Sequence, residues 1–178
     1  MNQEKLRLYH VDMKYVRNLH KKDDKVSSVS PQIGKQHRVY IGIVVICNER
    51  KYIIPLSHPT NKHQKMKPRV DFDKIFDKTG KIIGVLNYNQ MIPVEDNLIC
   101  MVDFNVKKGD SPAEKHYKQL CRDELTWCRK NESIICNKAN VLYKLCTDGN
   151  SNYKGKSRCL DFIRLEEECE RYCEKKQN

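Results

Sequence analysis

The sequence contains no pair of cysteines separated by two residues, although it has nine cysteines in all. Zinc ribbons and related structural zinc sites depend on that spacing, so its absence argues against a structural metal. The closest pair, Cys169 and Cys173, supplies only two thiols. An odd number of cysteines favours free thiols in a reducing compartment. We therefore expect a cytoplasmic protein that needs no metal and no other cofactor.

Long hydrophobic runs are also missing. The longest apolar run, Ile41–Cys47, is far too short to cross a bilayer. The first residues, Met1–Lys5, are polar and lack the apolar stretch of a secretory signal. No internal repeat is found. We expect a soluble protein without membrane contact, whose 178 residues form a single domain, 1–178.

Acidic residues are too few to balance the basic ones. The chain has 34 Lys and Arg against 23 Asp and Glu, which gives a formal net charge of +11. Such an excess predicts a polyanionic partner, of which nucleic acid is the commonest, although simple solubility is the alternative explanation. Hydrophobic residues make up 39% of the chain and occur in clusters, so a packed core is expected rather than disorder.

Two hydrophobic patterns divide the chain. Up to about residue 105, short alternating or β-branched runs predict strands at 6–12, 39–47, 51–56, 81–88, 91–94 and 98–104. Asp12 is expected to cap a short helix after the first strand, and Asn48-Glu49-Arg50 to form the turn after the second. After about residue 110, apolar residues recur at helical spacing and predict three helices, the first beginning with the capping box of Ser111 and Glu114. The expected fold class is α+β: a twisted, mostly antiparallel sheet in 1–105 and a helical part in 110–176.

Three local features add detail to this expectation. The run 39–47 predicts a central strand buried on both faces. Pro55, near the end of the next strand, suggests a sheet edge or an exit from the sheet. Loops are expected at 21–38 and 57–71, and Asp71 and Asp73 are expected to form ion pairs with nearby Lys and Arg rather than to bind metal.

Two segments carry side chains suited to phosphodiester chemistry. His37 and Arg38 precede the strand 39–47, and Ser57 and His58 follow the neighbouring strand. If the two strands form a hairpin, the start of one lies beside the end of the other. The four side chains would then lie close together.

A cluster of this kind suits metal-independent cleavage of RNA. The ribose 2′-OH loses a proton as it attacks the phosphorus, charge gathers on the non-bridging oxygens, and the 5′-oxygen is protonated as it leaves. Histidine serves as base or acid near neutral pH, and Lys and Arg stabilise the charge. Alternatively, Ser57 and His58 only shape a turn and the nearby lysines only position phosphates. On spacing alone, plain RNA binding is favoured over catalysis.

Further basic and aromatic residues are candidates for RNA binding, with ordinary solvated surface as the alternative. Tyr153 lies in a loop rich in Gly, Asn and Ser among several cations, and such an aromatic ring can stack on a base. The residues predicted to bind RNA are Lys35, His37, Lys65, Lys67, Arg69, Lys118, Arg122, Tyr153, Lys154, Lys156 and Arg158.

Several segments occur in the order typical of one toxin family: Leu8-Tyr9, Asp24-Lys25-Val26, Arg38–Val44, Tyr52–Ser57, Lys62-His63, Asn87–Val94 and Tyr117–Leu120. Together they span about residues 5 to 165 and resemble the ToxN/AbiQ family, most closely its CptN branch. These proteins are the toxins of type III toxin–antitoxin systems, whose antitoxin is an RNA.

The resemblance implies a Kid/MazF-like core, which is a strongly twisted antiparallel sheet with added helices. It implies a metal-independent endoribonuclease that cuts adenine-rich RNA, cellular or phage mRNA included, to 2′,3′-cyclic phosphate and 5′-OH ends. It also implies an RNA pseudoknot antitoxin, cut from a repetitive precursor by the toxin and inhibiting it in a closed ring of toxin and RNA.

The catalytic residues implied by the resemblance are Arg38, Ser57, Lys62 and His63. His58 stands where the family usually has a second serine, so we add it as a general acid or base, or as a replacement for a phosphate contact. Two alternatives remain: a basic RNA-binding module without chemistry, and a DNA-binding regulator, for which no helix-turn-helix signature is found.

Overall fold

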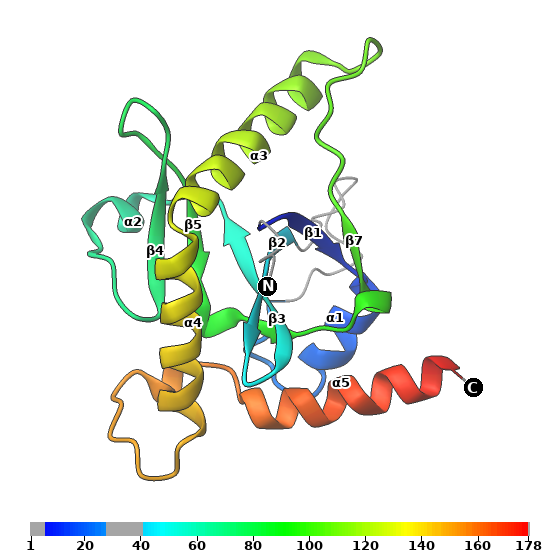
Figure 1. The fold of residues 1–178 in the computed structure, drawn as a ribbon, viewed down its shortest axis with the longest axis vertical. Coiled ribbons are helices and arrows are strands. Elements are labelled where there is room, and N and C mark those ends of the chain that lie inside the picture. Colours follow the sequence, from blue (N-terminus) through cyan, green and yellow to red (C-terminus); the bar gives the residue numbers. More distant parts are fainter. Residues whose placement is uncertain (1–5, 28–40, 178) are drawn as a thin grey trace.

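The computed structural model describes residues 6–27 and 41–177, and within them one antiparallel sheet forms the centre of the molecule (Figure 1). Its strand order is β4-β5-β3-β2-β1-β7, and β6 also pairs with β3. All pairings are antiparallel, which confirms the expected α+β class. The strands are β1 (Leu8–Val11), β2 (Ile41–Cys47), β3 (Arg50–Ser57), β4 (Phe72–Phe76), β5 (Ile82–Asn87), β6 (Ile92–Pro93) and β7 (Ile99–Met101).

The β2–β3 hairpin has the tight turn that its sequence predicts. Asn48 and Glu49 both have positive φ, +48° and +65°, as a two-residue turn of the type I′ class requires. This turn fixes the register, and at the far end Gly42 pairs with Pro55. A side chain on Gly42 would collide with the carbonyl oxygen of Ile54, so glycine allows the two strands to approach closely.

Two expectations about these strands are wrong. β2 is fully buried along one face only: Ile43 and Val45 are buried, whereas on the other face Val44 is half-buried and Ile46 is 52% exposed. An antiparallel strand needs a covering layer on one side only, so a β-branched run does not prove burial of both faces. β3 is also no edge strand: Pro55 lies within it, between the residues that pair with β6 and those that pair with β5.

Five helices and three short 3-10 turns complete the described part of the chain. The expected helix starts are confirmed: Asp12 accepts the backbone N–H of Lys14 at 2.8 Å, and Ser111 and Glu114 form the capping box. The helices are α1 (Met13–His20), α2 (Asn61–Lys65), α3 (Pro112–Lys130), α4 (Glu132–Thr147) and α5 (Phe162–Gln177), and the 3-10 turns are η1 (Tyr88–Gln90), η2 (Asp96–Leu98) and η3 (Lys156–Arg158). No helix of the described residues has the length and apolar character to cross a membrane.

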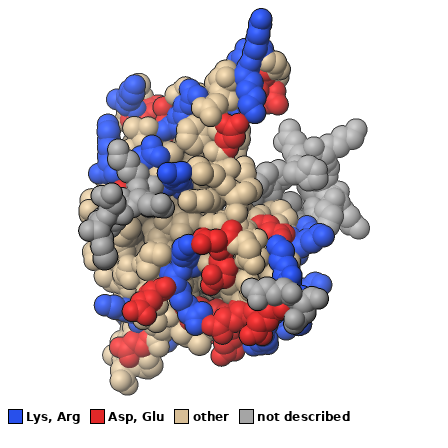
Figure 2. All heavy atoms as spheres, turned by 45° about the vertical axis from the view of Figure 1, so that its right-hand side comes forward, with Lys and Arg blue, Asp and Glu red and all other residues tan. Residues whose placement is uncertain are grey.

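The helices α3 and α4 run end to end along one side of the sheet, and α5 crosses below it (Figure 1). Tyr52 of β3 joins these layers, because its ring contacts Tyr143 of α4 and Phe162 of α5 at 5.7 and 5.8 Å. Its hydroxyl donates to buried Glu166 of α5 at 2.6 Å. Acidic side chains gather on the lower part of the face in Figure 2. On α5, Glu166 and Glu170 both pair with Arg50.

One buried carboxyl group lies between α3 and β5. Glu124 is 7% exposed, and a Cβ added to Gly84 would lie only 2.5 Å from its Oε1. Burial, with a smaller contribution from Asp123, raises the pKa of Glu124 to about 8. Because this pKa lies above that of the unfolded chain, the stability linked to the protonated group is present below about pH 4.5 and is lost as the pH rises through 8.

We predict that Glu124→Gln, which keeps the shape and removes the charge, raises the melting temperature at pH 9 more than at pH 5. A gain of about 1 kcal/mol corresponds to roughly 2–4 °C in a protein of this size. Thermal unfolding followed by circular dichroism between pH 5 and 9 measures the effect, with exposed Glu174→Gln as the control. A difference between Glu124→Gln and the wild type that does not change with pH contradicts the account.

Candidate functional site

The register of β3, β5 and β4 gathers polar side chains on one face of the sheet. Ser57 lies opposite Val85, and Val85 lies opposite Lys74 on its other side. Residues directly opposite in an antiparallel pair share a face, as do those two positions along a strand. Asn87 and Phe72, which also lie opposite each other, therefore belong to this surface, which we call the Ser57 face.

The opposite face of the same strands is anchored to α4. Asp73 is buried there and accepts from Lys138 Nζ at 2.6 Å and from the Tyr88 hydroxyl at 2.8 Å. Just before β4, buried Asp71 accepts from Arg158 Nη2 at 2.7 Å. The expected ion pairs of both carboxylates are thus confirmed. Within 6–27 and 41–177, no group of three His, Cys, Asp or Glu has the arrangement of a metal site.

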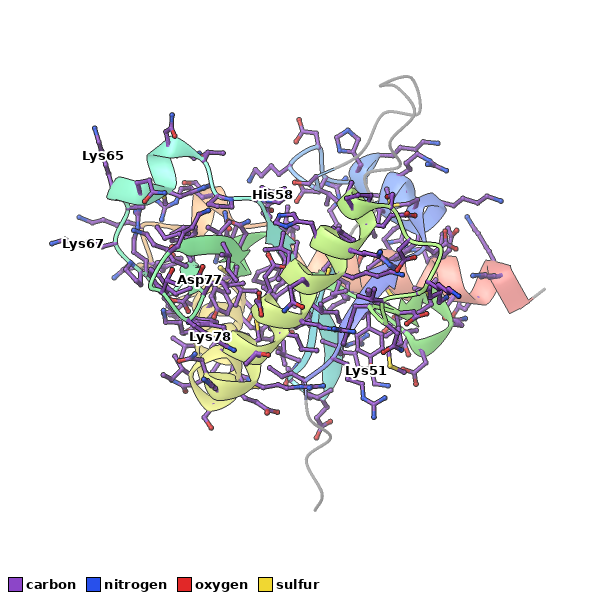
Figure 3. All side chains as sticks on the ribbon, turned by 90° about the horizontal axis from the view of Figure 1, so that it is seen from above. Lys51, His58, Lys65, Lys67, Asp77 and Lys78 are labelled. Carbon is purple, nitrogen blue, oxygen red and sulfur yellow. The ribbon has the colours of Figure 1, made fainter. Side chains whose placement is uncertain are left out.

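Ser57 lies at the end of β3 with its side chain exposed. Asn87 Nδ2 donates a hydrogen bond to Ser57 Oγ at 3.2 Å. His58 follows directly and is also exposed, and Figure 3 shows it at the end of β3, near the middle of the view. An exposed hydroxyl and an exposed imidazole therefore follow each other in the sequence at one end of a rigid strand.

The short helix α2 packs against the Ser57 face, and two contacts hold it there. The His63 ring stacks on Phe72 with centroids 5.4 Å apart, and Lys74 Nζ donates to the carbonyl oxygen of Gln64 at 3.0 Å. Thr60 begins the helix, and its carbonyl oxygen accepts the His63 backbone N–H at 2.9 Å. The segment expected to be a loop thus contains a helix, because His63 finds partners in β4 that lie outside its own segment.

The hydrogen bonds of His63 define the state of its ring. Nδ1 accepts the backbone N–H of Thr60 at 2.8 Å, so the neutral ring carries its proton on Nε2. Burial lowers the pKa of His63, and the positive charges of Lys62 and Lys74 lower it further. The ring is accordingly a neutral donor through Nε2 and a structural anchor for α2.

Three lysines around α2 face solvent. Lys62, Lys65 and Lys67 are exposed and form no ion pair with the described residues. Lys65 and Lys67 project outward from the edge of the molecule, on the side away from His58 (Figure 3). Exposed Arg69 follows them along the same segment. These cations are available to a polyanion that extends past the Ser57 face.

The residues predicted to bind RNA in the helical part lie in different environments. Lys118 is half-buried and pairs with Asp110 at 2.7 Å, and Arg158 is held by Asp71, so both already have intramolecular partners. Arg122 is half-buried, whereas Lys154 and Lys156 are exposed. An open hollow of about 480 Å³ lies beside Tyr153 and is lined by Val141, Lys144, Leu145, Asp148, Ser151, Asn152 and Tyr153.

Tyr153 has a defined position in its loop. A side chain on Gly155 would collide with the Tyr153 ring, so glycine leaves the space in which the ring lies. Burial, together with the Asp71 carboxylate, raises the pKa of the Tyr153 hydroxyl to about 12. The side chain is therefore a neutral, half-exposed aromatic ring beside the cations of its loop.

Lys35, His37 and Arg38 lie outside the described residues, so their position at the site stays a prediction. The hairpin that motivated it is confirmed, since Gly42 near the start of β2 pairs with Pro55 near the end of β3.

Sequence reasoning missed the contribution of Asn87, Phe72 and Lys74 to this surface. Alternation within a strand indicates which residues share a face, but it does not show which strands are neighbours or in what register. Asn87 did carry one signal, because it opens the segment Asn87–Val94 that the family resemblance includes.

Comparison with known proteins gives a consistent picture over nearly the whole chain. The family model described as toxin ToxN of type III toxin–antitoxin systems matches residues 7–170. The endoribonuclease ToxN of Bacillus thuringiensis subsp. kurstaki is 30% identical over 181 residues, covering 99% of this chain and 89% of the relative. The endoribonuclease AbiQ of Lactococcus lactis subsp. lactis is 28% identical, with coverage of 96% and 91%.

A solved structure of a bacterial type III toxin–antitoxin system, in which a non-coding RNA pseudoknot selectively inhibits the toxin, superposes with a TM-score of 0.79. It is 26% identical and covers 96% of this chain and 99% of its own. The architecture of sheet and helices is therefore shared over nearly the whole chain.

The geometry at His63 predicts its titration. We expect the ring to titrate below the ordinary value of 6.5 and to carry its proton on Nε2 when neutral. Nitrogen-15 NMR of labelled histidine rings between pH 4 and 8 measures both properties, and the variant His63→Gln identifies the signal. A titration midpoint at or above 6.5, or a proton on Nδ1, contradicts the described contacts.

Proposed function

The chain belongs to the ToxN toxin family of type III toxin–antitoxin systems, and from this premise we propose that it is an RNA-cleaving toxin whose reaction takes place on the Ser57 face. The observation that carries the proposal is the pair of exposed side chains Ser57 and His58 at the end of β3, with Asn87 bonded to the serine. Two relatives in sequence that bear the name endoribonuclease support it.

The proposed reaction is the attack of a ribose 2′-OH on the adjacent phosphorus without a metal ion. His58, an exposed imidazole at the end of β3, is the proposed general acid or base and exchanges a proton with the 2′-OH or the leaving 5′-oxygen. Ser57, Lys62 and Arg38 stabilise the charge that develops on the non-bridging oxygens. The products are a 2′,3′-cyclic phosphate and a 5′-hydroxyl.

His63 has a different role in this proposal from that of His58. Its Nδ1 accepts a backbone N–H and its ring is stacked on Phe72, so it holds α2 and the exposed Lys62 beside the site. Only Nε2–H remains as a donor toward a phosphate oxygen. In this proposal His58 transfers protons, whereas His63 positions α2 and Lys62.

RNA binding extends from the site over the neighbouring cations. Lys65, Lys67 and Arg69 continue the exposed basic segment beyond α2. Arg158 retains a role although one of its N–H groups is bonded to Asp71, because its guanidinium has further donors and its side chain is 50% exposed. Tyr153 and its hollow offer a stacking position for an adenine base.

The natural inhibitor in this proposal is an RNA pseudoknot that the toxin cuts from a repetitive precursor and that then covers the site in a closed ring of alternating toxin and RNA. The related solved system, inhibited by a non-coding RNA pseudoknot, supports this partner. The free toxin, a single domain acting in the cytoplasm, would cut adenine-rich sites in cellular or phage mRNA.

Ser57→Ala is predicted to lower the cleavage rate at least about 100-fold, the usual effect of removing one donor from developing charge. Antitoxin binding should stay within about two-fold, because the phosphate contacts are spread over many cations. Cleavage and filter binding of a labelled precursor measure both quantities, with exposed Ser133→Ala on α4 as the control. Full activity of Ser57→Ala contradicts the assignment of the active site to the Ser57 face. A wild-type protein that binds the precursor but never cuts it is a non-catalytic RNA-binding module.

Tyr153→Ala is predicted to weaken RNA binding by about 5- to 100-fold, the value of one stacked base. The cleavage rate at saturating RNA should change much less, because Tyr153 belongs to the loop after α4 and not to the strands of the Ser57 face. Tyr153→Phe keeps the ring and should bind as the wild type does. An unchanged dissociation constant for Tyr153→Ala at matched salt concentration contradicts the stacking role.

A further inference from the structure

We infer that Asn87 is a positioning residue that fixes the direction of the Ser57 hydroxyl, so that Ser57 donates its proton to a phosphate oxygen. The inference rests on the proposed function of the Ser57 face and assigns a specific task to one contact within it. The contact is the hydrogen bond from Asn87 Nδ2 to Ser57 Oγ, 3.2 Å long.

The polarity of this hydrogen bond determines what the serine can do. An amide nitrogen only donates, so Ser57 Oγ accepts from Asn87 and uses one of its lone pairs. The hydroxyl has a single proton, which is then directed away from Asn87. Because the Ser57 side chain is exposed, that proton points toward the space that a bound phosphodiester would occupy.

Asn87 is suited to this task because its backbone is held on both sides. It is the last residue of β5 and lies opposite Phe72 of β4. The next residue, Tyr88, is fully buried, donates its backbone N–H to the Asp71 carbonyl oxygen at 3.1 Å, and donates its hydroxyl to Asp73. A side chain anchored in this way holds its partner more accurately than one on a loop does.

A Ser57 proton that points toward the phosphate can stabilise the charge that develops during the reaction. Negative charge grows on the non-bridging oxygens as the 2′-oxygen attacks, and a donor already aimed at them needs no reorientation during the step. If the Ser57 hydroxyl instead donated its hydrogen bond to Asn87, it would present only lone pairs to the phosphate. The amide of Asn87 thereby makes Ser57 a donor toward the developing charge rather than a base.

Asn87→Asp tests the polarity directly, since it keeps the shape and replaces the donor with an acceptor. The ionised carboxylate should accept a hydrogen bond from the Ser57 hydroxyl, so we expect kcat to fall about 10- to 100-fold at pH 8 while KM stays within about two-fold. The ratio of mutant to wild-type kcat should recover at lower pH, where a protonated Asp donates again. Asn137→Asp, which adds the same charge at an exposed position of α4, should keep wild-type kinetics.

Asn87→Ala gives a second and independent measurement. It should lower kcat about 10-fold with no change in the shape of the pH profile, and it should have no further effect when Ser57 is already alanine, because the two residues act as a unit. Thermal unfolding of each variant identifies any loss of folded protein.

The outcomes separate the inference from the proposed function. Wild-type cleavage that Ser57→Ala abolishes, combined with wild-type kinetics in both Asn87 variants, overturns the inference and leaves the function standing. An Asn87→Asp variant whose loss of kcat is the same at every pH overturns the assigned polarity. Absence of any cleavage by the wild type overturns the function itself.

Discussion

The antiparallel register of β3, β5 and β4 is the constraint on which the rest of the site depends. Alternate residues of a strand point to opposite faces, so a shift of one residue in β5 would turn Asn87 toward the core and Leu86 toward solvent. Buried Asp73, bonded to both Tyr88 and Lys138, fixes β4 against α4 and opposes such a shift. The polar contacts on the face anchored to α4 thus keep the side chains of the Ser57 face in position.

The distribution of charge follows from the same arrangement. Two glutamates of α5 are paired with cations from other elements, Glu168 with Lys22 and Glu170 with Arg50, so part of the acidic charge is neutralised on that side. The lysines around α2 have no such partners among the described residues. A polyanion that approaches this protein is therefore attracted toward the Ser57 face and away from α5.

Local sequence signals predicted the elements well. The turn at Asn48-Glu49, the cap at Asp12 and the capping box at Ser111 depend only on neighbouring residues, and the structure confirms all three. The helix α2 was missed because its anchors, Phe72 and Lys74, come from a different segment. The burial of β2 was overestimated for a similar reason, because the sequence of a strand does not show which elements cover its two faces.

The sequence predicts a location for the candidate site but not the hydrogen bonds and ion pairs that connect its residues. Ser57, His58 and the cations around α2 follow from the sequence and the family resemblance. The bond from Asn87 to Ser57 joins residues 30 positions apart, and the pairing of Lys138 with Asp73 spans 65. Contacts of this kind depend on strand order and register, which no local pattern in either segment contains.

The central claim is that the side chains of the Ser57 face cut RNA by attack of the 2′-OH. The most direct measurement is incubation of the protein, freed of bound RNA, with an adenine-rich RNA in EDTA, followed by analysis of the product ends. The account predicts cleavage with 2′,3′-cyclic phosphate and 5′-hydroxyl ends. Cleavage that stops in EDTA, or products with 5′-phosphate ends, would contradict it.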